Sequence, residues 1–145
     1  MAVVIGCDHG GFELKNEIKK HLEDLGLAVQ DFGTYTKDSV EYPDIAEAVC
    51  VPVAAGAFDF GILVCGTGIG ISIAANKVDG IRAAHCTDAY SAAKAKEHNN
   101  ANVICLGGRI TGVDLALTIV DAYLGAEFEG GRHQTRVDKI MALEK

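Results

Sequence analysis

The sequence predicts an α/β fold in which helices cover both faces of a parallel sheet. Short apolar runs rich in β-branched residues alternate with segments of helical spacing along the whole chain. No linker, low-complexity tract or internal repeat interrupts this alternation. A chain of 145 residues also suits one domain with a substantial core. We therefore expect a single domain, residues 1–145, built on a doubly wound sheet.

Five of the apolar runs are predicted to be strands, because each is short, β-branched and bounded by turn residues. For five such strands we expect the order 2-1-3-4-5 of a Rossmann-like or flavodoxin-like sheet, which reverses between strands one and three. Ligands of such sheets bind at the carboxyl ends of the strands, at that point of reversal. The predicted strands are Val3–Gly6, Leu27–Asp31, Phe60–Val64, Ile81–Ala84 and Val103–Leu106.

The segments between the strands carry apolar residues at helical intervals, and their ends have recognisable stop and cap residues. Pro43 suits the first turn of the second helix, whereas Pro52 should bend or end it. The first predicted helix carries an apolar stripe from Leu14 to Leu25 and stops at Gly26, and the second lies around Ile45, Val49 and Val53. The third covers Ile71–Lys77, and the fourth is alanine-rich, is capped by Thr87 or Asp88 and runs to His98. The fifth covers Val113–Leu124 and stops at Gly125.

The composition limits the kinds of partner. A net charge of −7 argues against a nucleic acid or an anionic membrane surface as the main partner, so a phosphate site needs a local cluster of cations. No apolar run reaches the roughly 20 residues that cross a bilayer. The start, Met1–Gly6, reads as the first strand and lacks the basic region of a signal peptide, so we expect a cytoplasmic protein.

The five cysteines form no Cys-x-x-Cys pair, so their spacing predicts neither a disulfide framework nor a zinc site. Cys50 and Cys105 lie within apolar runs, as buried free thiols usually do. Cys65 differs because it stands at a glycine-rich turn.

That turn, Cys65-Gly66-Thr67-Gly68-Ile69-Gly70, links a predicted strand to a predicted helix. Backbone N–H groups at such a junction hold anions, and glycine lets the backbone approach a ligand closely. A thiol beside a helix N-terminus favours the reactive thiolate form. The turn matches neither the dinucleotide fingerprint nor the P-loop, and it lacks the Arg of a phosphatase loop. We predict an oxyanion cradle with Cys65 and Thr67 on its rim.

Further polar residues follow other predicted strands. Asp8 and His9 come after the first strand, at the predicted point of reversal, where they can bind sugar hydroxyls and phosphate. The alternative is a capping Asp and a surface His. Arg109 follows the fifth strand and should point into the same crevice. His98 and Asn99 end the alanine-rich helix, where they either serve the site or only complement the helix dipole and stop the helix.

A basic pair stands near the end of the chain, after Gly130-Gly131. Arg132 and Arg136 are four residues apart, so on a helical tail they share one face and can converge on one phosphate. The alternative is a solvated basic face balanced by nearby carboxylates. Such a tail can also cross to a partner subunit and complete its site.

Four motifs together resemble type B ribose-5-phosphate isomerases. They are Cys-Asp-His-Gly-Gly-Phe at residues 7–12, Cys-Gly-Thr-Gly-Ile-Gly-Ile-Ser-Ile-Ala-Ala-Asn-Lys at 65–77, His-Asn-Asn-Ala-Asn-Val at 98–103 and Glu-Gly-Gly-Arg-His-Gln-Thr-Arg at 129–136. The wider family includes galactose-6-phosphate isomerase subunits and enzymes that act on allose 6-phosphate. The resemblance implies a cofactor-free aldose–ketose isomerase of the pentose phosphate pathway that interconverts D-ribose 5-phosphate and D-ribulose 5-phosphate through a cis-enediolate. It also implies a homodimer, or a dimer of dimers, whose sites are shared between subunits.

The resemblance also implies a role for each site residue. Cys65 would be the base that moves a proton between C1 and C2, and His98 would open the furanose ring with help from Asp8 and Thr67. The remaining implied substrate contacts are the cradle Gly66, Thr67, Gly68, Ile69 and Gly70, the phosphate ligands His9, Arg132 and Arg136, and the further ligands Asn99 and Arg109. One branch of the family has a glutamate base where Ile71 stands here, so this chain groups with the cysteine branch.

Three other functions stay open at this point. The same chemistry could act on allose 6-phosphate or galactose 6-phosphate. A flavodoxin-like module could bind a phosphate or nucleotide without turnover. A thiol redox sensor would need Cys7 or Cys86 as the partner of Cys65. We expect no metal-ligand cluster, which favours the enediol route over a metal-assisted hydride shift.

Overall fold

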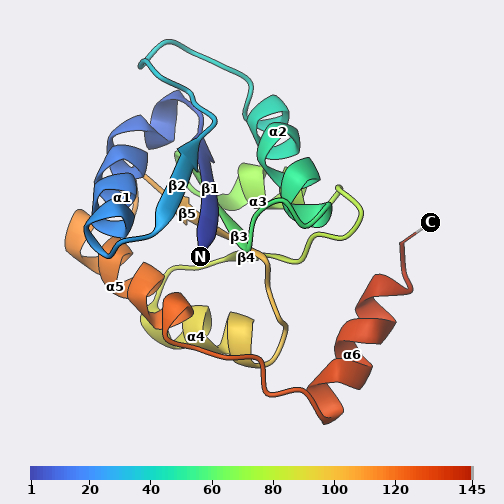
Figure 1. Ribbon diagram of the computed structural model, residues 1–145. Coiled ribbons are helices and arrows are strands. Elements are labelled where there is room, and N and C mark those ends of the chain that lie inside the picture. Colours follow the sequence, from blue (N-terminus) through green and yellow to red (C-terminus); the bar gives the residue numbers. More distant parts are fainter. Residues whose placement is uncertain (145) are drawn as a thin grey trace.

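The computed structural model describes residues 1–144 and contains one five-stranded sheet in which all neighbouring strands are parallel (Figure 1). The predicted α/β class with a doubly wound sheet is confirmed. The strands are β1 (Ala2–Cys7), β2 (Ala28–Asp31), β3 (Phe60–Cys65), β4 (Ala83–His85) and β5 (Val103–Gly107).

The observed strand order is β2-β1-β3-β5-β4, so the predicted order 2-1-3-4-5 is wrong for the last two strands. All five residues of β5 are buried, whereas β4 has three residues, of which His85 is exposed. The longer apolar strand therefore takes the interior position beside β3, and the short, partly exposed strand forms the edge.

Helices cover both faces of the sheet, as Figure 1 shows. On one face β1, β3 and β5 pack against α1, α4 and α5, and on the other face they pack against α2 and α3. Pro52 lies near the end of α2, and Asp88 caps α4 by accepting the N–H of Ser91 at 2.7 Å. The helices are α1 (Phe12–Asp24), α2 (Tyr42–Ala54), α3 (Ile69–Ala75), α4 (Ala89–Glu97), α5 (Val113–Leu124) and α6 (Arg132–Met141).

The predicted helical tail is α6, which stands apart from the sheet at the red end of the ribbon in Figure 1. It follows Gly130 and Gly131, which both have positive φ. Within residues 1–144 none of the helices combines the length and the apolar character that crossing a membrane requires.

A buried lysine ties α1 to the segment that follows β2. Lys15 is 1% exposed, and its Nζ donates to both carboxylate oxygens of Asp31, at 3.0 and 2.9 Å, and to the Thr34 carbonyl at 2.7 Å. The ammonium also lies 5.4 Å from the ring centre of Phe12 and 5.5 Å from that of Tyr35. These contacts hold the start of the long connection that leads to α2.

Candidate active site

Three turns meet at the carboxyl edge of the sheet. The predicted topology placed the turns after β1 and β3 together, and the turn after β5 joins them because β5 lies beside β3. They follow β1, β3 and β5, whose last residues lie side by side: Cys7 pairs with Val64, and Cys65 pairs with Gly107. Backbone hydrogen bonds join the turns, because Gly108 N–H donates to the Cys65 carbonyl at 2.8 Å and Arg109 N–H donates to the Gly66 carbonyl at 3.0 Å.

Glycine makes this close approach possible. A Cβ built on Gly11 would lie 2.5 Å from the carbonyl oxygen of Val64, and one on Gly107 would lie 2.5 Å from that of Thr67. A side chain at either position would push the turns apart. The glycines are therefore needed where the three turns touch one another.

Cys65 ends β3 and is 5% exposed. Its Sγ accepts the N–H of Gly68 at 3.1 Å, and the neighbouring Thr67 Oγ1 accepts the N–H of Ile69 at 3.2 Å. Gly68 has a φ of +83°, a backbone conformation that favours glycine. In the turn that was expected to form the cradle, two N–H groups therefore bond to the side chains of Cys65 and Thr67.

Asp8 and His9 lie beside this turn. Asp8 is buried, and its Oδ1 accepts the Gly10 N–H at 2.9 Å, so it does cap a short 3-10 helix, His9–Gly11. The Nδ1 of His9 accepts the backbone N–H of Val40 at 3.3 Å. A backbone N–H only donates, so Nδ1 is the acceptor in this contact and Nε2 carries the N–H that can donate to a ligand.

Arg109 also lies at this turn. A Cβ built on Gly66 would lie 3.4 Å from a terminal nitrogen of its guanidinium. The sequence-predicted residues Asp8, His9, Cys65, Thr67 and Arg109 and the glycines of the turn are therefore together, and we refer to them as the carboxyl-edge group. A cavity of about 210 Å³ beside them is lined in part by His9, Gly108 and Arg109.

Sequence reasoning missed two side chains at this edge. The Tyr42 ring covers Gly70, since a Cβ there would lie 2.8 Å from ring carbon Cζ. The His85 ring covers Gly68 in the same way, at 2.8 Å. His85 follows a predicted strand directly, and that position was a usable signal. Tyr42 had no comparable local signal, because only the tertiary fold brings the start of α2 to this turn.

His98 and Asn99 lie at the opposite, amino edge of the sheet. The helix α4 runs back from the end of β4, and His98 caps its C-terminus. Shortly after, the Asn102 carbonyl accepts the N–H of Gly61, near the start of β3. The six residues of β3 separate this edge from Cys65 by about 17 Å. One chain therefore does not bring His98 and Asn99 to Cys65, as a single complete site would require.

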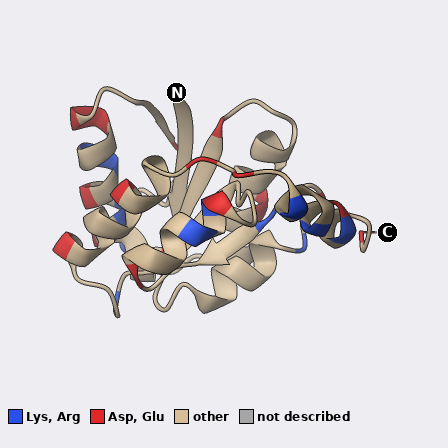
Figure 2. Cartoon of the chain, turned by 90° about the horizontal axis from the view of Figure 1, so that it is seen from below, with Lys and Arg blue, Asp and Glu red and all other residues tan. Residues whose placement is uncertain are grey.

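Arg132 and Arg136 belong to the same edge as His98. Both are exposed on α6, where Figure 2 shows a concentration of cationic residues on the helix nearest the C-terminus. The first turn of α6 is anchored by His133, whose ring stacks on that of His98 with centroids 4.1 Å apart and planes 6° apart. Burial lowers the pKa of His133, and the nearby His98 and Arg132 lower it further. We call His98, Asn99, Arg132 and Arg136 the amino-edge group.

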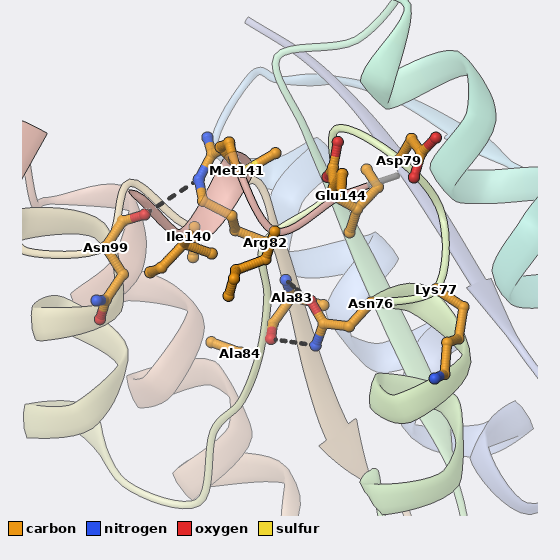
Figure 3. A pocket seen from close by; sticks show the side chains of 13 residues that line it. Asn76, Lys77, Asp79, Arg82, Ala83, Ala84, Asn99, Ile140, Met141 and Glu144 are labelled. Carbon is orange, nitrogen blue, oxygen red and sulfur yellow. Dashed lines mark hydrogen bonds between the residues drawn. The ribbon is translucent and has the colours of Figure 1, made fainter. Parts of the chain in front are cut away.

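A groove of about 750 Å³ adjoins the amino-edge group (Figure 3). It lies between the end of α3, the start of β4 and the last turn of α6. The Arg82 guanidinium crosses it and donates to the carbonyls of Asn99 and Asn100, at 3.1 and 2.8 Å. The groove is bounded by polar and apolar side chains, among them Asn76, Asn99, Ile140, Met141 and Glu144.

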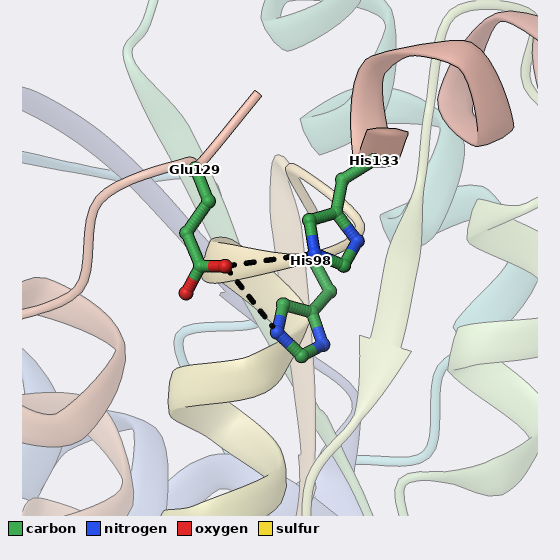
Figure 4. A group of neighbouring side chains, drawn as sticks. All are labelled: His98, Glu129 and His133. Carbon is green, nitrogen blue, oxygen red and sulfur yellow. Dashed lines mark ion pairs between the residues drawn. The ribbon is translucent and has the colours of Figure 1, made fainter. Parts of the chain in front are cut away.

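His98, Glu129 and His133 form a group of potential metal ligands (Figure 4). Glu129 Oε1 lies 3.6 Å from His98 Nε2 and 3.5 Å from His133 Nε2. No metal-ligand cluster was expected, and the fold brings these three potential ligands together. Nothing in their spacing along the chain signalled the group, because the fold alone brings the end of α4 to the start of α6.

The other cysteines are buried free thiols. Burial raises the pKa of Cys7 to about 11, of Cys50 to about 12 and of Cys86 to about 11. Burial likewise raises the pKa of Cys105 well above its ordinary value. A resolving thiol must form a thiolate, so the raised pKa values of Cys7 and Cys86 argue against the redox-sensor function.

Comparison with known proteins gives consistent matches along the whole chain. Residues 3–140 match the family model described as Ribose/Galactose Isomerase. The chain is 52% identical over 143 residues to ribose-5-phosphate isomerase B of Escherichia coli, covering 99% of this chain and 96% of that protein.

Solved structures agree with the sequence matches. Ribose-5-phosphate isomerase B of Clostridium thermocellum superposes with a TM-score of 0.97 at 56% identity, over 99% of this chain and 97% of that one. The corresponding enzyme of Mycoplasma genitalium, solved with bound ribulose 5-phosphate, gives a TM-score of 0.94 at 44% identity, over 97% and 94% of the two chains.

Proposed function

The chain belongs to the ribose/galactose isomerase family, and we propose that it interconverts D-ribose 5-phosphate and D-ribulose 5-phosphate in sites that two copies of the chain build together. The observation that carries this proposal is the carboxyl-edge group. It places a thiol, the backbone N–H groups of a glycine-rich turn and polar side chains at the carboxyl edge of the sheet, where parallel sheets bind ligands.

The chemistry requires a base beside a carbonyl. A C–H next to a carbonyl is weakly acidic, so a positioned base and donors aimed at the developing oxyanion lower the barrier. Cys65, as its thiolate, takes the proton from C2 of the open-chain aldose and returns it to C1, while a proton passes from O2 to O1, which gives the ketose. The N–H groups of the 66–70 turn stabilise the cis-enediolate between these two steps. The donors that now bond to Cys65 and Thr67 are close enough to serve it.

Ring opening and phosphate binding fall to the amino-edge group. His98 exchanges protons with the ring oxygen and the anomeric hydroxyl, assisted by Asp8 and Thr67 across the site. Arg132 and Arg136 hold the phosphate. The protein has a net charge of −7, so an anionic substrate needs such a local pair of cations.

The separation of the two groups argues for a homodimer. About 17 Å of sheet lies between Cys65 and the amino edge of the same chain, and the substrate is far shorter. A two-fold axis would place the carboxyl-edge group of one subunit against the amino-edge group of the other, twice per dimer. Asn99 and Arg109 then face the substrate from opposite subunits. Two such dimers can associate further without altering the sites.

His9 and Asp8 contact the sugar-phosphate from the carboxyl edge. The Nε2–H of His9 suits a hydroxyl or phosphate oxygen, and the Asp8 carboxylate suits a hydroxyl proton. Remote binding of the phosphate fixes the reacting carbons, and a displacement of about 1 Å can cost ~100-fold in rate.

The testing experiment measures ketose formation from ribose 5-phosphate by protein that has been dialysed against a chelator. We expect turnover, and we expect weaker turnover of allose 6-phosphate and galactose 6-phosphate in parallel assays. The family model names galactose as well as ribose, so turnover of a hexose phosphate alone would keep the chemistry and change the substrate. Binding of all three without turnover would refute the isomerase and support a non-catalytic phosphate-binding module.

A further inference from the structure

We propose that His98, Glu129 and His133 bind a transition-metal cation of the Zn²⁺ type, and that the bound ion prevents His98 from opening the sugar ring. The three side chains come from the end of α4, from the loop before α6 and from the first turn of α6. Metal binding stands on geometry alone. Its effect on turnover rests on the proposed function.

The distances suit a small tetrahedral ion. Zinc binds imidazole nitrogen at about 2.0–2.1 Å and carboxylate oxygen at about 2.0–2.2 Å, so two ligand atoms of one tetrahedral ion lie ~3.3–3.5 Å apart. The carboxylate oxygen of Glu129 lies 3.6 Å from His98 Nε2 and 3.5 Å from His133 Nε2. All three donor atoms lie within 4.8 Å of one another. If the two distances from the Glu129 oxygen shorten by a few tenths of an ångström, both reach the separation of ligand atoms on one tetrahedral ion.

The backbone positions of the three ligands are fixed by hydrogen bonds. His98 N–H donates to the Lys94 carbonyl at 2.9 Å, Glu129 N–H donates to the Glu97 carbonyl at 2.9 Å, and His133 N–H donates to the Gly130 carbonyl at 3.0 Å. The His133 side chain is 7% exposed, whereas those of His98 and Glu129 are 35% and 48% exposed. One ligand is therefore held rigidly, and the other two leave a path for an ion from solvent.

Binding needs one side-chain rotation. The imidazole lone pairs lie in the ring planes, and the planes of His98 and His133 are only 6° apart, so the two lone pairs do not converge as the rings stand. His98 is the freer ring, and turning it about its side-chain torsions brings its Nε2 toward an ion held by His133 and Glu129. The backbone need not move.

The surroundings select the kind of ion. Arg132 and Arg136 lie on the same helix as His133 and repel any cation, so ligand chemistry must supply the affinity. Mg²⁺ and Ca²⁺ prefer sets of oxygen ligands, and Glu129 is the one carboxylate in the group. Two imidazoles and one carboxylate instead suit Zn²⁺, with the fourth position left to water.

An ion bound in this way occupies the Nε2 of His98, the residue to which the proposed function assigns ring opening. Zn²⁺ should therefore slow the turnover of ribose 5-phosphate, which is mostly cyclic in solution. The loss should be reversed by a chelator, because removing the ion frees His98 and no covalent bond has changed.

The test is a calorimetric titration of the metal-free protein with Zn²⁺, repeated with Mg²⁺. Loss of an outer-shell partner typically weakens metal binding ~10–100-fold, so Glu129→Gln and His133→Asn, which remove direct ligands, should each weaken Zn²⁺ binding at least ~10-fold. Glu127→Gln is the matched control, because it removes the same charge from the same loop outside the group. Mg²⁺ should bind no variant.

Thiols are the competing zinc ligands, and Co²⁺ distinguishes them by its absorption. Co²⁺ in the proposed site should show tetrahedral d–d bands without a sulfur-to-cobalt charge-transfer band, and Cys65→Ser should leave the spectrum unchanged. The proposal fails if Zn²⁺ does not bind, if both ligand variants bind as the native protein does, or if Cys65→Ser abolishes binding. Zn²⁺ that binds without slowing turnover would refute the effect on His98 alone. A protein inactive from the start would refute the proposed function and leave the binding result standing.

Discussion

A pair of hybrid dimers tests the sharing of sites most directly. One hybrid joins a Cys65→Ala subunit to a subunit in which Arg132 and Arg136 are both alanine. The other joins a native subunit to a subunit that carries all three changes. Both hybrids contain the same substitutions in total and differ only in how these are distributed between the chains.

The structure sets the expected magnitudes. Because about 17 Å of sheet separates Cys65 from the amino edge, each site should take its thiol from one chain and its arginines from the other. The first hybrid then has one site with the thiol and both arginines intact, and one site with none of them, so it should keep about half of the native activity. In the second hybrid each site lacks either the thiol or the arginines, so almost no activity should remain.

The assay is ketose formation from ribose 5-phosphate by hybrids purified through a different affinity tag on each subunit. The three substituted side chains are accessible or small, so the fold should persist, and thermal unfolding of each hybrid checks this. Sites contained in single chains give the reverse pattern, with no activity in the first hybrid and half in the second. That outcome would refute the argument that each site combines the carboxyl edge of one subunit with the amino edge of the other.

Four further outcomes are expected. Cys65→Ala should lower kcat by ~10²–10⁴ with little change in substrate affinity, while Cys50→Ala should keep kcat, as steady-state kinetics will show. Alkylation at pH 8 followed by mass spectrometry should leave Cys50 unmodified in the folded protein, because burial raises its pKa to about 12 and it stays protonated far above that pH; early modification of Cys50 would contradict its burial. Lys15→Met leaves a buried carboxylate without its main partner, so the free energy of unfolding should fall by about 3 kcal/mol and Tm by roughly 6–12 °C; an unchanged Tm would show that the pair is not needed. Gly68→Ala places a Cβ 2.8 Å from the His85 ring at a φ of +83°, so it should cost at least about 1–2 kcal/mol and reduce turnover, and a native melting curve would argue against the turn as described.

The fold was largely predictable because its signals are local. Apolar periodicity, the proline near the start of α2 and the stops at Gly26 and Gly125 all act within a few residues, and each helix appears where they predicted it. The order of β4 and β5 was not predictable in this way. Both strands have short apolar sequences, and their order depends on which one buries more surface beside β3, a property of the assembled sheet.

The candidate site was likewise predictable only in part. The carboxyl-edge group followed from one topological rule, because parallel strands bring their succeeding turns to one edge. Sequence motifs identified His98 and Arg132 but carried no information on their distance from Cys65. The contact of His98 with Glu129 and His133 depends on how α6 returns to the end of α4, and no pattern within either segment specifies that.

Sites shared between subunits, as proposed above, would change what gene duplication can do with this chain. In an ordinary enzyme a copy that loses its base is simply inactive. Here one copy could lose its thiol and the other its arginines, and a pair of the two would still hold one full set of groups. Each copy would then depend on the other, so selection would preserve both genes. The unused half of each chain would be free to acquire a new ligand.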